Sequence, residues 1–221
     1  MCGRFSLDVE LGTLQEAFQF EFSGELQPRY NIAPSQNVLA ITADGGRRTG
    51  NLFRWGLVPP WSKDLKIGYK MINARSETAA EKPSFKRPFQ SKRCLIPASG
   101  YFEWKREGKE KRPFRFIMKD EEPFVLAGLY EKWEQEEEAV YTCTILTTSP
   151  NSLQGAIHDR MPVILNEEGM EAWLDKESRM DELKSLCRPF PAREMRMYEV
   201  SQKVNSAKNE TAEILSPLNS Q

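Results

Sequence analysis

Short apolar segments separated by polar turns dominate the middle of the chain. They are rich in β-branched and aromatic residues, and Gly, Pro or Asp residues stand between them, which is the pattern of β-strands. The predicted strands cover residues 38–41, 52–55, 94–96, 101–104, 114–118, 124–127 and 140–147. Segment 27–35 contains two prolines and no periodicity, so we expect an ordered loop there. The close spacing of the strands predicts a compact β-rich core.

Residues 8–18 show helical periodicity. Leu11, Leu14 and Phe18 recur at three- and four-residue spacing, which places them on one face of a helix. Asp8 precedes them and belongs to the residue types that cap helix N-termini through a side-chain oxygen. We therefore expect an amphipathic helix that begins after Asp8 and packs on the core.

The last third of the chain predicts further helices. Asn166 is a capping residue followed by acidic residues, which favour a helix N-terminus. Helical character continues over residues 180–187 and stops before Pro189. Together with the strands, these segments predict an α+β fold without internal repeats. The acidic run 134–138 is expected to be an exposed hairpin tip.

Length and composition fit one soluble domain. With 221 residues the chain can bury a sizeable core, and it has no apolar run near the roughly 20 residues that cross a bilayer. We expect a single domain over residues 1–221, with its core at about residues 2–205 and a loosely ordered C-terminal tail. The first residues lack the apolar centre of a secretion signal and reach an acidic side chain at Asp8, so a cytoplasmic protein without membrane contact is expected.

The net charge and the cysteine content limit which partners and cofactors we expect the protein to bind. A net charge of −1 gives no global attraction for nucleic acid, so DNA binding would need a local basic cluster. The four cysteines are Cys2, Cys94, Cys143 and Cys187. Because they form no C-x-x-C pair and the chain has one histidine, neither a zinc site nor a disulfide framework is expected. We expect no metal, no cofactor, and buried structural roles for the last three cysteines.

Cys2 is the first candidate for a reactive residue. Removal of Met1 would place a thiol and a free α-amine on adjacent carbons, and no internal cysteine can offer this 1,2-aminothiol. An α-amine titrates near ~7.7–8.0 and a thiol near ~8.5, so both nucleophiles are accessible around neutral pH. From its position alone, the favoured interpretation of Cys2 is a small second residue of no consequence.

His158 and Glu103 are the candidate proton-transfer groups. His158 is the single histidine and has Asp159 and Arg160 as polar neighbours, so it suits either a structural role or proton shuttling near neutral pH. Strand alternation places Glu103 on the same face as Tyr101. Taken alone, that pattern favours a solvent-facing carboxylate, with an acid or base as the alternative.

Several polar and aromatic segments suit nucleic-acid binding. The run Asn73-Ala-Arg-Ser-Glu alternates polar side chains that could hold a sugar and a phosphate. Arg4 and Arg160 offer further phosphate contacts, and three contacts would give a log-log salt slope of about −2 on single strands. Exposed indoles at Trp55 and Trp61 could stack on bases, although Trp55 is as compatible with core packing.

A basic stretch follows the Asn73 segment. It comprises Lys82, Lys86, Arg87, Lys92 and Arg93, interleaved with Phe85 and Phe89. Such a stretch is by default a solvated face, and DNA contact is the alternative.

Six ordered segments together carry a family resemblance. They are Met1-Cys-Gly-Arg-Phe, Arg29-Tyr-Asn-Ile-Ala-Pro, Trp55-Gly-Leu-Val-Pro, Asn73-Ala-Arg-Ser-Glu-Thr, Tyr101-Phe-Glu-Trp and Ile157-His-Asp-Arg-Met-Pro. In these segments and their order, the chain closely resembles the SRAP family, the abasic-site processing proteins. The resemblance extends over nearly the whole chain, to about residues 200–205.

The resemblance implies a barrel-like core and a positively charged cleft that receives Cys2 after Met1 is removed. By matching positions it assigns Cys2 as the nucleophile, Asn73 as its orienting group, Glu103 and His158 as proton-transfer groups, Arg4, Arg75 and Arg160 as phosphate contacts, and Pro34 and Trp61 as contacts to the bases beside the lesion. The implied partner is single-stranded DNA with an abasic site, bound by a monomer.

The sequence thus favours a sensor that forms a covalent thiazolidine crosslink through Cys2 and shields the lesion. Removal of Met1 by the domain itself would add a peptidase activity, and a lyase-type activity on the DNA is a further expectation. One alternative is a thiol protease that uses Cys2 with Glu103 and His158. Another is a DNA-binding adaptor that makes no covalent product. On DNA, the protein would be found at the nucleoid.

Overall fold

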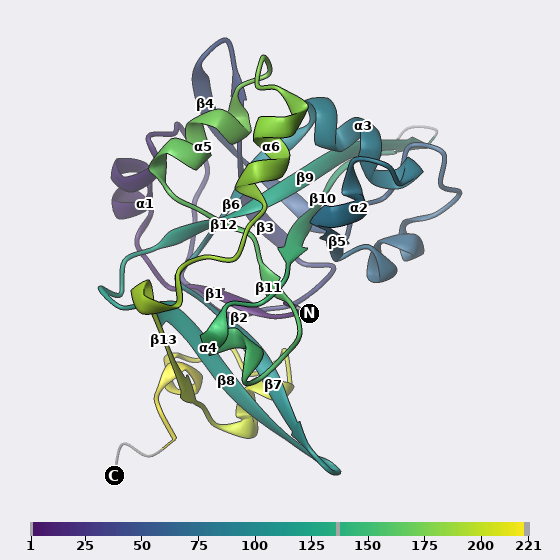
Figure 1. Cartoon of the computed structure of the whole chain (residues 1–221). Helices are drawn as coiled ribbons and strands as arrows, with labels where there is room; N and C mark the ends of the chain where they lie inside the picture. Colours follow the sequence, from purple (N-terminus) through teal and green to yellow (C-terminus); the bar gives the residue numbers. More distant parts are fainter. Residues whose placement is uncertain (1, 136–137, 219–221) are drawn as a thin grey trace.

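Two β-sheets share one hydrophobic core in the computed structural model, which describes residues 2–135 and 138–218 (Figure 1). The first sheet runs in the order β13 (Met195–Glu199), β8 (Glu110–Met118), β7 (Gly100–Glu107), β1 (Phe5–Leu7) and β2 (Arg29–Ile32). The second runs in the order β11 (Met161–Pro162), β10 (Glu138–Thr148), β4 (Arg47–Trp55), β3 (Asn37–Asp44), β6 (Arg93–Ala98), β9 (Phe124–Gln135) and β12 (Ile164–Leu165), with β5 (Asn73–Arg75) paired to β10.

The second sheet closes on itself. Strand β9 pairs with β6 on one side and with β10 on the other, and β10 also pairs with β4. The path β10, β4, β3, β6 and β9 therefore returns to its start, and only the β4–β10 pairing within this ring is parallel. Closure pairs every ring strand on both sides, which removes exposed strand edges. The barrel-like core that the family resemblance implied is confirmed.

Aromatic pairs join the two sheets and fill their core. The rings of Phe5 on β1 and Trp55 on β4 meet edge to face with centroids 5.2 Å apart. Tyr101 and Phe116, directly opposite each other on β7 and β8, stack at 4.9 Å. The indole of Trp55 is 1% exposed and donates to the Ile72 carbonyl at 2.8 Å, so this side chain belongs to the core and base stacking by it was a wrong alternative.

The helices cover the barrel. They are α1 (Leu11–Phe18), α2 (Ser76–Ala79), α3 (Pro83–Ser91), α4 (Ser152–Gly155), α5 (Glu167–Leu174) and α6 (Met180–Leu186), with 3₁₀ turns η1 (Leu65–Lys70), η2 (Ala192–Glu194), η3 (Gln202–Asn205) and η4 (Ala212–Leu215). Helices α3, α5 and α6 gather at one end of the molecule, and the β7–β8 hairpin projects from the other (Figure 1). Among the described residues, no helix has the length and apolarity to cross a membrane.

Helix and strand predictions agree with the structure except in a few local details. The helix at residues 11–18 and the cap at Asn166 are confirmed, the latter through a 3.0 Å bond from the Gly169 N–H. The cap at Asp8 was wrong: its carboxylate binds Ser99 and lies 3.2 Å from Arg115 instead. Part of the expected loop 27–35 is strand β2, which pairs with β1 at the sheet edge. Residues 136–137 of the acidic run lie outside the described residues.

The basic stretch at residues 82–93 forms α3 and the start of β6. Phe85 and Phe89 are buried, and Phe89 packs edge to face on Trp173 at 5.5 Å. Arg93 is also buried and donates to the carbonyls of Trp173 and Asp175 at 2.7 and 2.6 Å. Phe85, Phe89 and Arg93 therefore belong to the core, because helix α3 turns its aromatic residues inward.

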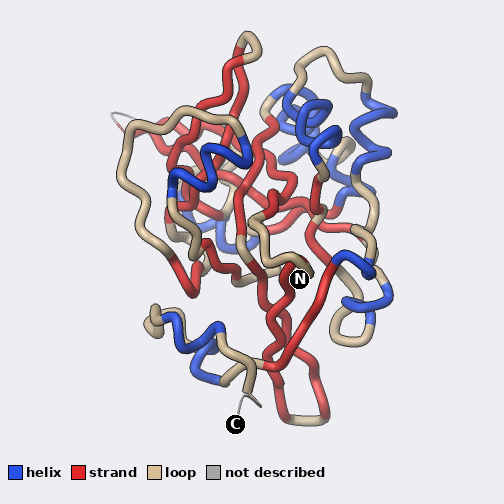
Figure 2. Tube along the Cα trace, turned by 90° about the vertical axis from the view of Figure 1, so that its left-hand side faces the viewer, coloured by secondary structure: helices blue, strands red, loops and turns tan. Residues whose placement is uncertain are grey.

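The segment after residue 205, for which we expected a loosely ordered tail, contributes buried side chains. Val204, Ile214 and Leu215 pack with Phe102 of β7 in a small second cluster. Figure 2 shows this segment lying beside the base of the β7–β8 hairpin. The segment therefore borders the same strand that carries Glu103.

Candidate active site

The pairing of β1 with β7 brings the N-terminus to Glu103. Phe5 lies opposite Tyr101, and the Phe102 N–H donates to the Arg4 carbonyl at 2.9 Å. Because the two strands are antiparallel, the chain before Phe5 runs beside the chain after Tyr101. This register places Cys2 in the neighbourhood of Glu103, and both side chains are buried, at 0% and 3% exposure. The solvent-facing position that the strand pattern alone favoured for Glu103 was wrong.

Burial and charge together keep the Cys2 thiol protonated. Desolvation, followed by the negative charge of Glu103, raises the pKa of Cys2 to about 12. The thiol makes a weak contact to the Arg4 carbonyl at 4.0 Å. At neutral pH this sulfur is therefore a thiol, and a base must accept its proton during any nucleophilic attack.

Asn73 holds the backbone of Cys2. Its Nδ2 donates to the Cys2 carbonyl at 2.8 Å, across 71 positions of sequence. Strand β5 fixes Asn73 in place through parallel pairing with Ile145 of β10. The Oδ1 atom of Asn73 is buried and has no hydrogen-bond partner among the described residues. An acceptor left in this state suits a donor that arrives with a substrate.

Glu103 and His158 line one cavity of about 490 Å³. Trp104, Arg106, Lys111 and Asn205 complete its wall. The His158 Nδ1 lies 3.1 Å from the Arg160 backbone nitrogen and 2.9 Å from Asp159 Oδ1. Glu103 and His158 therefore border a common space. Cys2 and Asn73 do not line this cavity.

Gln154 links the two halves of the site and was missed from the sequence. It is fully buried, accepts from the Tyr101 hydroxyl at 3.0 Å and donates to the Arg160 carbonyl at 2.9 Å. Burial, with the nearby Cys2 and Glu103, raises the pKa of Tyr101 well above its usual range. Gln154 thereby ties β7 to the loop that carries His158. Nothing in the local pattern around residue 154 distinguishes it from an ordinary surface glutamine.

Arg4 is half-buried and bonded to partners within the protein. Its Nη1 donates to Asn31 Oδ1 at 2.7 Å and to the Val204 carbonyl at 2.8 Å. Burial lowers the pKa of Arg4. The Nη1 atom of Arg4 is therefore already bonded within the protein. The sequence motif alone did not reveal these bonds.

Arg160 and Arg75 lie near one carboxylate. Both terminal nitrogens of Arg160 bind Glu77, at 2.6 and 2.8 Å, and Nη2 also donates to the Thr147 carbonyl at 2.6 Å. The hydrogen bond from Arg160 lowers the pKa of Glu77, and the charge of exposed Arg75 adds to this effect. Any phosphate that binds Arg160 must share it with Glu77.

Pro34 and Trp61 lie in turns at the surface. Pro34 is half-buried in the β2–β3 turn, whose next residue Ser35 has a left-handed φ of 73°. Arg54 donates to the Ser35 carbonyl at 2.9 Å and lies 6.0 Å from the Tyr69 ring centroid. The Trp61 side chain is 63% exposed. An exposed indole of this kind is available for stacking.

The remaining thiols and acidic groups do not form a metal site. Burial raises the pKa of Cys94 and of Cys143, and it raises the pKa of Cys187 to about 12. Cys94 and Cys143 lie in the core, as predicted, whereas Cys187 is partly exposed. Within residues 2–135 and 138–218, no group of His, Cys, Asp and Glu side chains is arranged to hold a metal ion.

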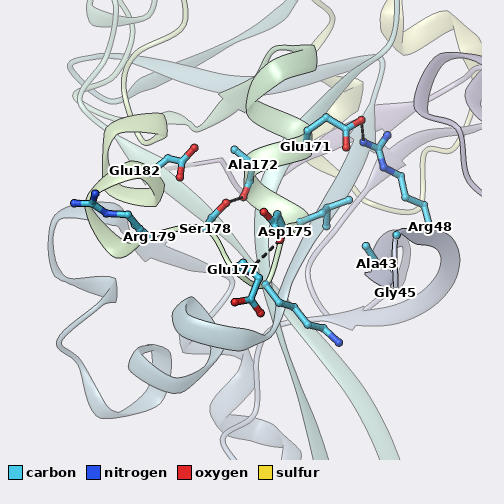
Figure 3. A pocket seen from close by; sticks show the side chains of 13 residues that line it. Ala43, Gly45, Arg48, Glu171, Ala172, Asp175, Glu177, Ser178, Arg179 and Glu182 are labelled. Atoms are coloured by element: carbon cyan, nitrogen blue, oxygen red, sulfur yellow. Dashed lines mark hydrogen bonds and ion pairs between the residues drawn. The ribbon is translucent and has the colours of Figure 1, made fainter.

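A second cavity, of about 740 Å³, lies between the β3–β4 turn and the α5–α6 connection (Figure 3). Its three basic side chains are each ion-paired: Arg48 binds Glu171 at 2.5 Å, Lys176 binds Asp44 at 2.5 Å and Arg179 binds Asp181 at 2.8 Å. None of the site residues predicted from the sequence lines it. The chemistry predicted from the sequence therefore points to the cavity of Glu103 and His158.

Comparison with known proteins gives a consistent picture. A family model described as SOS response associated peptidase (SRAP) matches residues 1–207. The abasic site processing protein YoqW of Bacillus subtilis is 52% identical over 221 residues, which covers 97% of this chain and 99% of that protein. The abasic site processing protein YedK of Escherichia coli is 30% identical, covering 99% of this chain and 100% of that protein.

A solved structure shares the fold. The crystal structure of a protein from Bacteroides thetaiotaomicron superposes with a TM-score of 0.90 at 30% sequence identity, covering 98% of this chain and 99% of that one. The α+β architecture described above is therefore that of an experimentally observed fold.

Proposed function

Because the chain belongs to the SOS response associated peptidase (SRAP) family, we propose that it recognises abasic sites in single-stranded DNA and traps their aldehyde covalently through Cys2 once Met1 is removed. The observation that carries the proposal is the meeting of three distant segments at the N-terminus: Cys2, Asn73 bonded to its carbonyl, and Glu103 buried beside its thiol. Relatives named as abasic site processing proteins support the choice of substrate.

The covalent step consumes one aldehyde and releases one water. The freed α-amine of Cys2 adds to the C1′ aldehyde of the ring-opened deoxyribose, and loss of water gives an imine. The Cys2 sulfur then adds to the same carbon while its proton passes to the nitrogen, which closes a five-membered thiazolidine. The ring has no C=N bond, so it resists the β-elimination by which a simple imine cleaves the strand.

Proton transfer is assigned to Glu103 and His158. The thiol is protonated at neutral pH, so Glu103 accepts its proton as the C–S bond forms and returns it to the nitrogen. His158, across the shared cavity, assists opening of the sugar ring. The same exchanges in reverse would reopen the ring and release the DNA slowly. No cofactor enters any of these steps.

Removal of Met1 is required for a chemical and a geometric reason. In the Met1-containing chain the Cys2 nitrogen is an amide, which is not a nucleophile, and Cys2 is fully buried. A free terminus supplies the amine and lets residue 2 move toward the cavity. A positive α-ammonium next to the thiol would also lower the thiol pKa.

Self-removal of Met1 is a second activity that the same residues support. The Cys2 thiol can attack the preceding Met1 carbonyl, with Glu103 accepting its proton. The Met1–Cys2 C–N bond then breaks as that proton passes to the Cys2 nitrogen, and water hydrolyses the resulting thioester to release methionine. The peptidase in the family description favours this activity. Cleavage of unrelated peptides would need a peptide groove, so a general protease is the less supported function.

DNA positioning is assigned to the surface around the site. Arg4, Arg75 and Arg160 hold phosphates of the strand, with Arg160 exchanging part of its bond to Glu77 for a phosphate oxygen. Pro34 and Trp61 contact the bases beside the lesion. We propose that the protein works as a monomer in the cytoplasm, associating with nucleoid DNA when lesions are exposed.

The test uses the full chain and a uracil-excised single-stranded oligonucleotide. We expect a band that survives heating in denaturing gels, with an intact mass equal to protein without Met1 plus DNA minus one water. Cys2→Ala should abolish it. Cys187→Ala removes the most exposed of the other thiols and should crosslink like the wild type.

Two outcomes would reject the proposal. Equal crosslinking by Cys2→Ala would show that another nucleophile reacts. Reversible binding without a covalent product, by protein shown by mass to lack Met1, would favour the adaptor function instead.

A further inference from the structure

Gln154 is the one buried residue of the segment that carries His158. Every other residue from 151 to 160 is half-buried or exposed, and the apolar packing of the segment is limited to Leu153 and Ile157. A segment with so few buried apolar contacts opens at a low cost in free energy. Hydrogen bonds therefore contribute much of what fixes the position of the His158 side chain.

Gln154 bonds the backbone on both sides of the imidazole. Its carbonyl accepts from the His158 N–H at 2.9 Å, and its side-chain Nε2 donates to the Arg160 carbonyl at 2.9 Å. The Gln154 N–H itself donates to the side chain of Asn151, the cap of α4, at 2.8 Å. One buried residue thus ties the loop that carries His158 to a short helix.

The Gln154 side chain also reaches strand β7, where its Oε1 lies 3.0 Å from the Tyr101 hydroxyl. The Arg160 carbonyl can only accept, so the amide nitrogen of Gln154 faces it and the amide oxygen faces Tyr101. Burial raises the pKa of Tyr101 well above its usual range, so the phenol is protonated at neutral pH and can donate to that oxygen. The direction of both hydrogen bonds is therefore determined.

Tyr101 is a rigid anchor on the strand that carries Glu103. The two residues are two positions apart on β7, so their side chains lie on the same face of the strand. The Tyr101 ring stacks on Phe116 at 4.9 Å and meets Phe124 edge to face at 6.5 Å. Its hydroxyl therefore gives the His158 segment a fixed reference point beside Glu103.

We propose that Tyr101 and Gln154 form a positioning pair, which holds the His158 segment against the strand of Glu103 so that the imidazole meets the abasic sugar as its ring opens. Neither residue lines the cavity, so both act through His158. The pair rests on the proposed function, because it concerns the same site. It gives a role to two buried side chains that the proposed mechanism does not use.

Two single variants test the pair. Tyr101→Phe keeps the stacked ring and removes the hydroxyl, whereas Gln154→Met keeps the length of the side chain and removes both amide bonds. At saturating abasic single-stranded DNA, we expect the single-turnover rate of adduct formation to fall about tenfold in each, because an acid–base group is misplaced. The DNA concentration that gives half of the maximal rate should stay within about threefold of wild type, because the pair makes no contact with the strand.

Tyr198→Phe is the matched control. It removes the phenol on β13 that accepts from Arg115 at 3.0 Å, a hydrogen bond outside the proposed pair. This variant should form the adduct at the wild-type rate. The double variant Tyr101→Phe/Gln154→Met should be no slower than Gln154→Met alone, since both changes break the same connection.

A second substrate separates positioning from general damage to the site. An oligonucleotide whose lesion is an open-chain aldehyde, without the hydroxyl that closes the sugar ring, needs no ring opening. Both single variants should crosslink it within about twofold of the wild-type rate, because the step assigned to His158 is bypassed. His158→Ala should show the same dependence on substrate, with a larger loss on the abasic site.

Wild-type rates for Tyr101→Phe and Gln154→Met on the abasic site would overturn the positioning pair. Equal slowing on both substrates would also overturn it, and so would a His158→Ala protein as fast as wild type, since the pair would then have nothing to act through. If wild-type protein crosslinks neither substrate, the proposed function itself fails. A wild type that crosslinks both, matched by the two variants, removes only the pair.

Discussion

Asn73 holds the backbone of the N-terminus with a single side chain. Its amide spends one donor on the Cys2 carbonyl at 2.8 Å and leaves its Oδ1 buried without a described partner. A hydrogen bond of this kind contributes only about 1 kcal/mol to stability, yet it fixes where the residue 2 backbone lies. The value of Asn73 should therefore appear in rate rather than in stability.

Asn73→Asp tests this orienting role. The substitution keeps the size of the side chain but replaces the donor with a carboxylate facing the Cys2 carbonyl. We expect the single-turnover rate of adduct formation at saturating DNA to fall about 10²-fold, the cost of a misplaced reacting group. Asn37→Asp, at an exposed position of β3, is the control. A rate within threefold of wild type would contradict the assignment.

At the scale of elements, strand β2 fastens the C-terminal segment to the site. Asn31 is fully buried; its Nδ2 donates to the carbonyls of Ser206 and Asn209 at 3.0 and 2.8 Å, and its Oδ1 accepts from Arg4. Glu210 accepts from the Asn31 N–H at 2.9 Å. One side chain thus connects the N-terminal strand, the sheet edge and the segment that includes Asn205.

Asn31→Ala should loosen this connection. We expect the free energy of unfolding to fall by about 3 kcal/mol, because several hydrogen bonds are lost and buried polar groups remain unpaired. Denaturant titration measures the loss, and limited proteolysis should cut the chain first after residue 200. Asn37→Ala should change stability by less than about 0.5 kcal/mol. Equal stability of the two variants would refute the role of Asn31.

At the scale of the whole molecule, buried protonated groups set the alkaline limit of the fold. Desolvation raises the pKa of both Cys2 and Cys187 to about 12, and burial also raises the pKa of Tyr101. In the unfolded chain the thiols titrate near 9. Above that pH the unfolded state binds fewer protons than the folded state, so stability falls as pH rises.

We therefore expect the unfolding free energy to be insensitive to these groups below about pH 9 and to decline between about pH 9 and 12. Urea titrations at a series of pH values, with thiolate absorbance followed in parallel, measure this decline. Cys187→Ala should make it shallower. Thiolate formation near pH 9 in protein that is still folded would contradict the proposed burial.

Local sequence patterns were enough to predict the main strands and helices of this protein and its family. Short runs of β-branched and aromatic residues between turn residues predicted the strands, and three- to four-residue spacing predicted the helix at residues 11–18. Short motifs identified the family and, through it, Cys2, Asn73, Glu103 and His158 as candidate site residues. The strand, helix and family inferences succeeded because they depend on neighbours in sequence, whereas the roles of the site residues stay predictions.

Only the tertiary structure decided which distant segments meet. The barrel closes through the pairing of β9 with β10. Arg4 binds Asn31 and also Val204, which lies 200 positions away, and Arg160 pairs with Glu77 across 83 positions. Alternation indicates that a side chain faces inward, but strand register determines its partner. For that reason the sequence alone favoured an exposed Glu103, whereas pairing of β1 with β7 buries it beside Cys2.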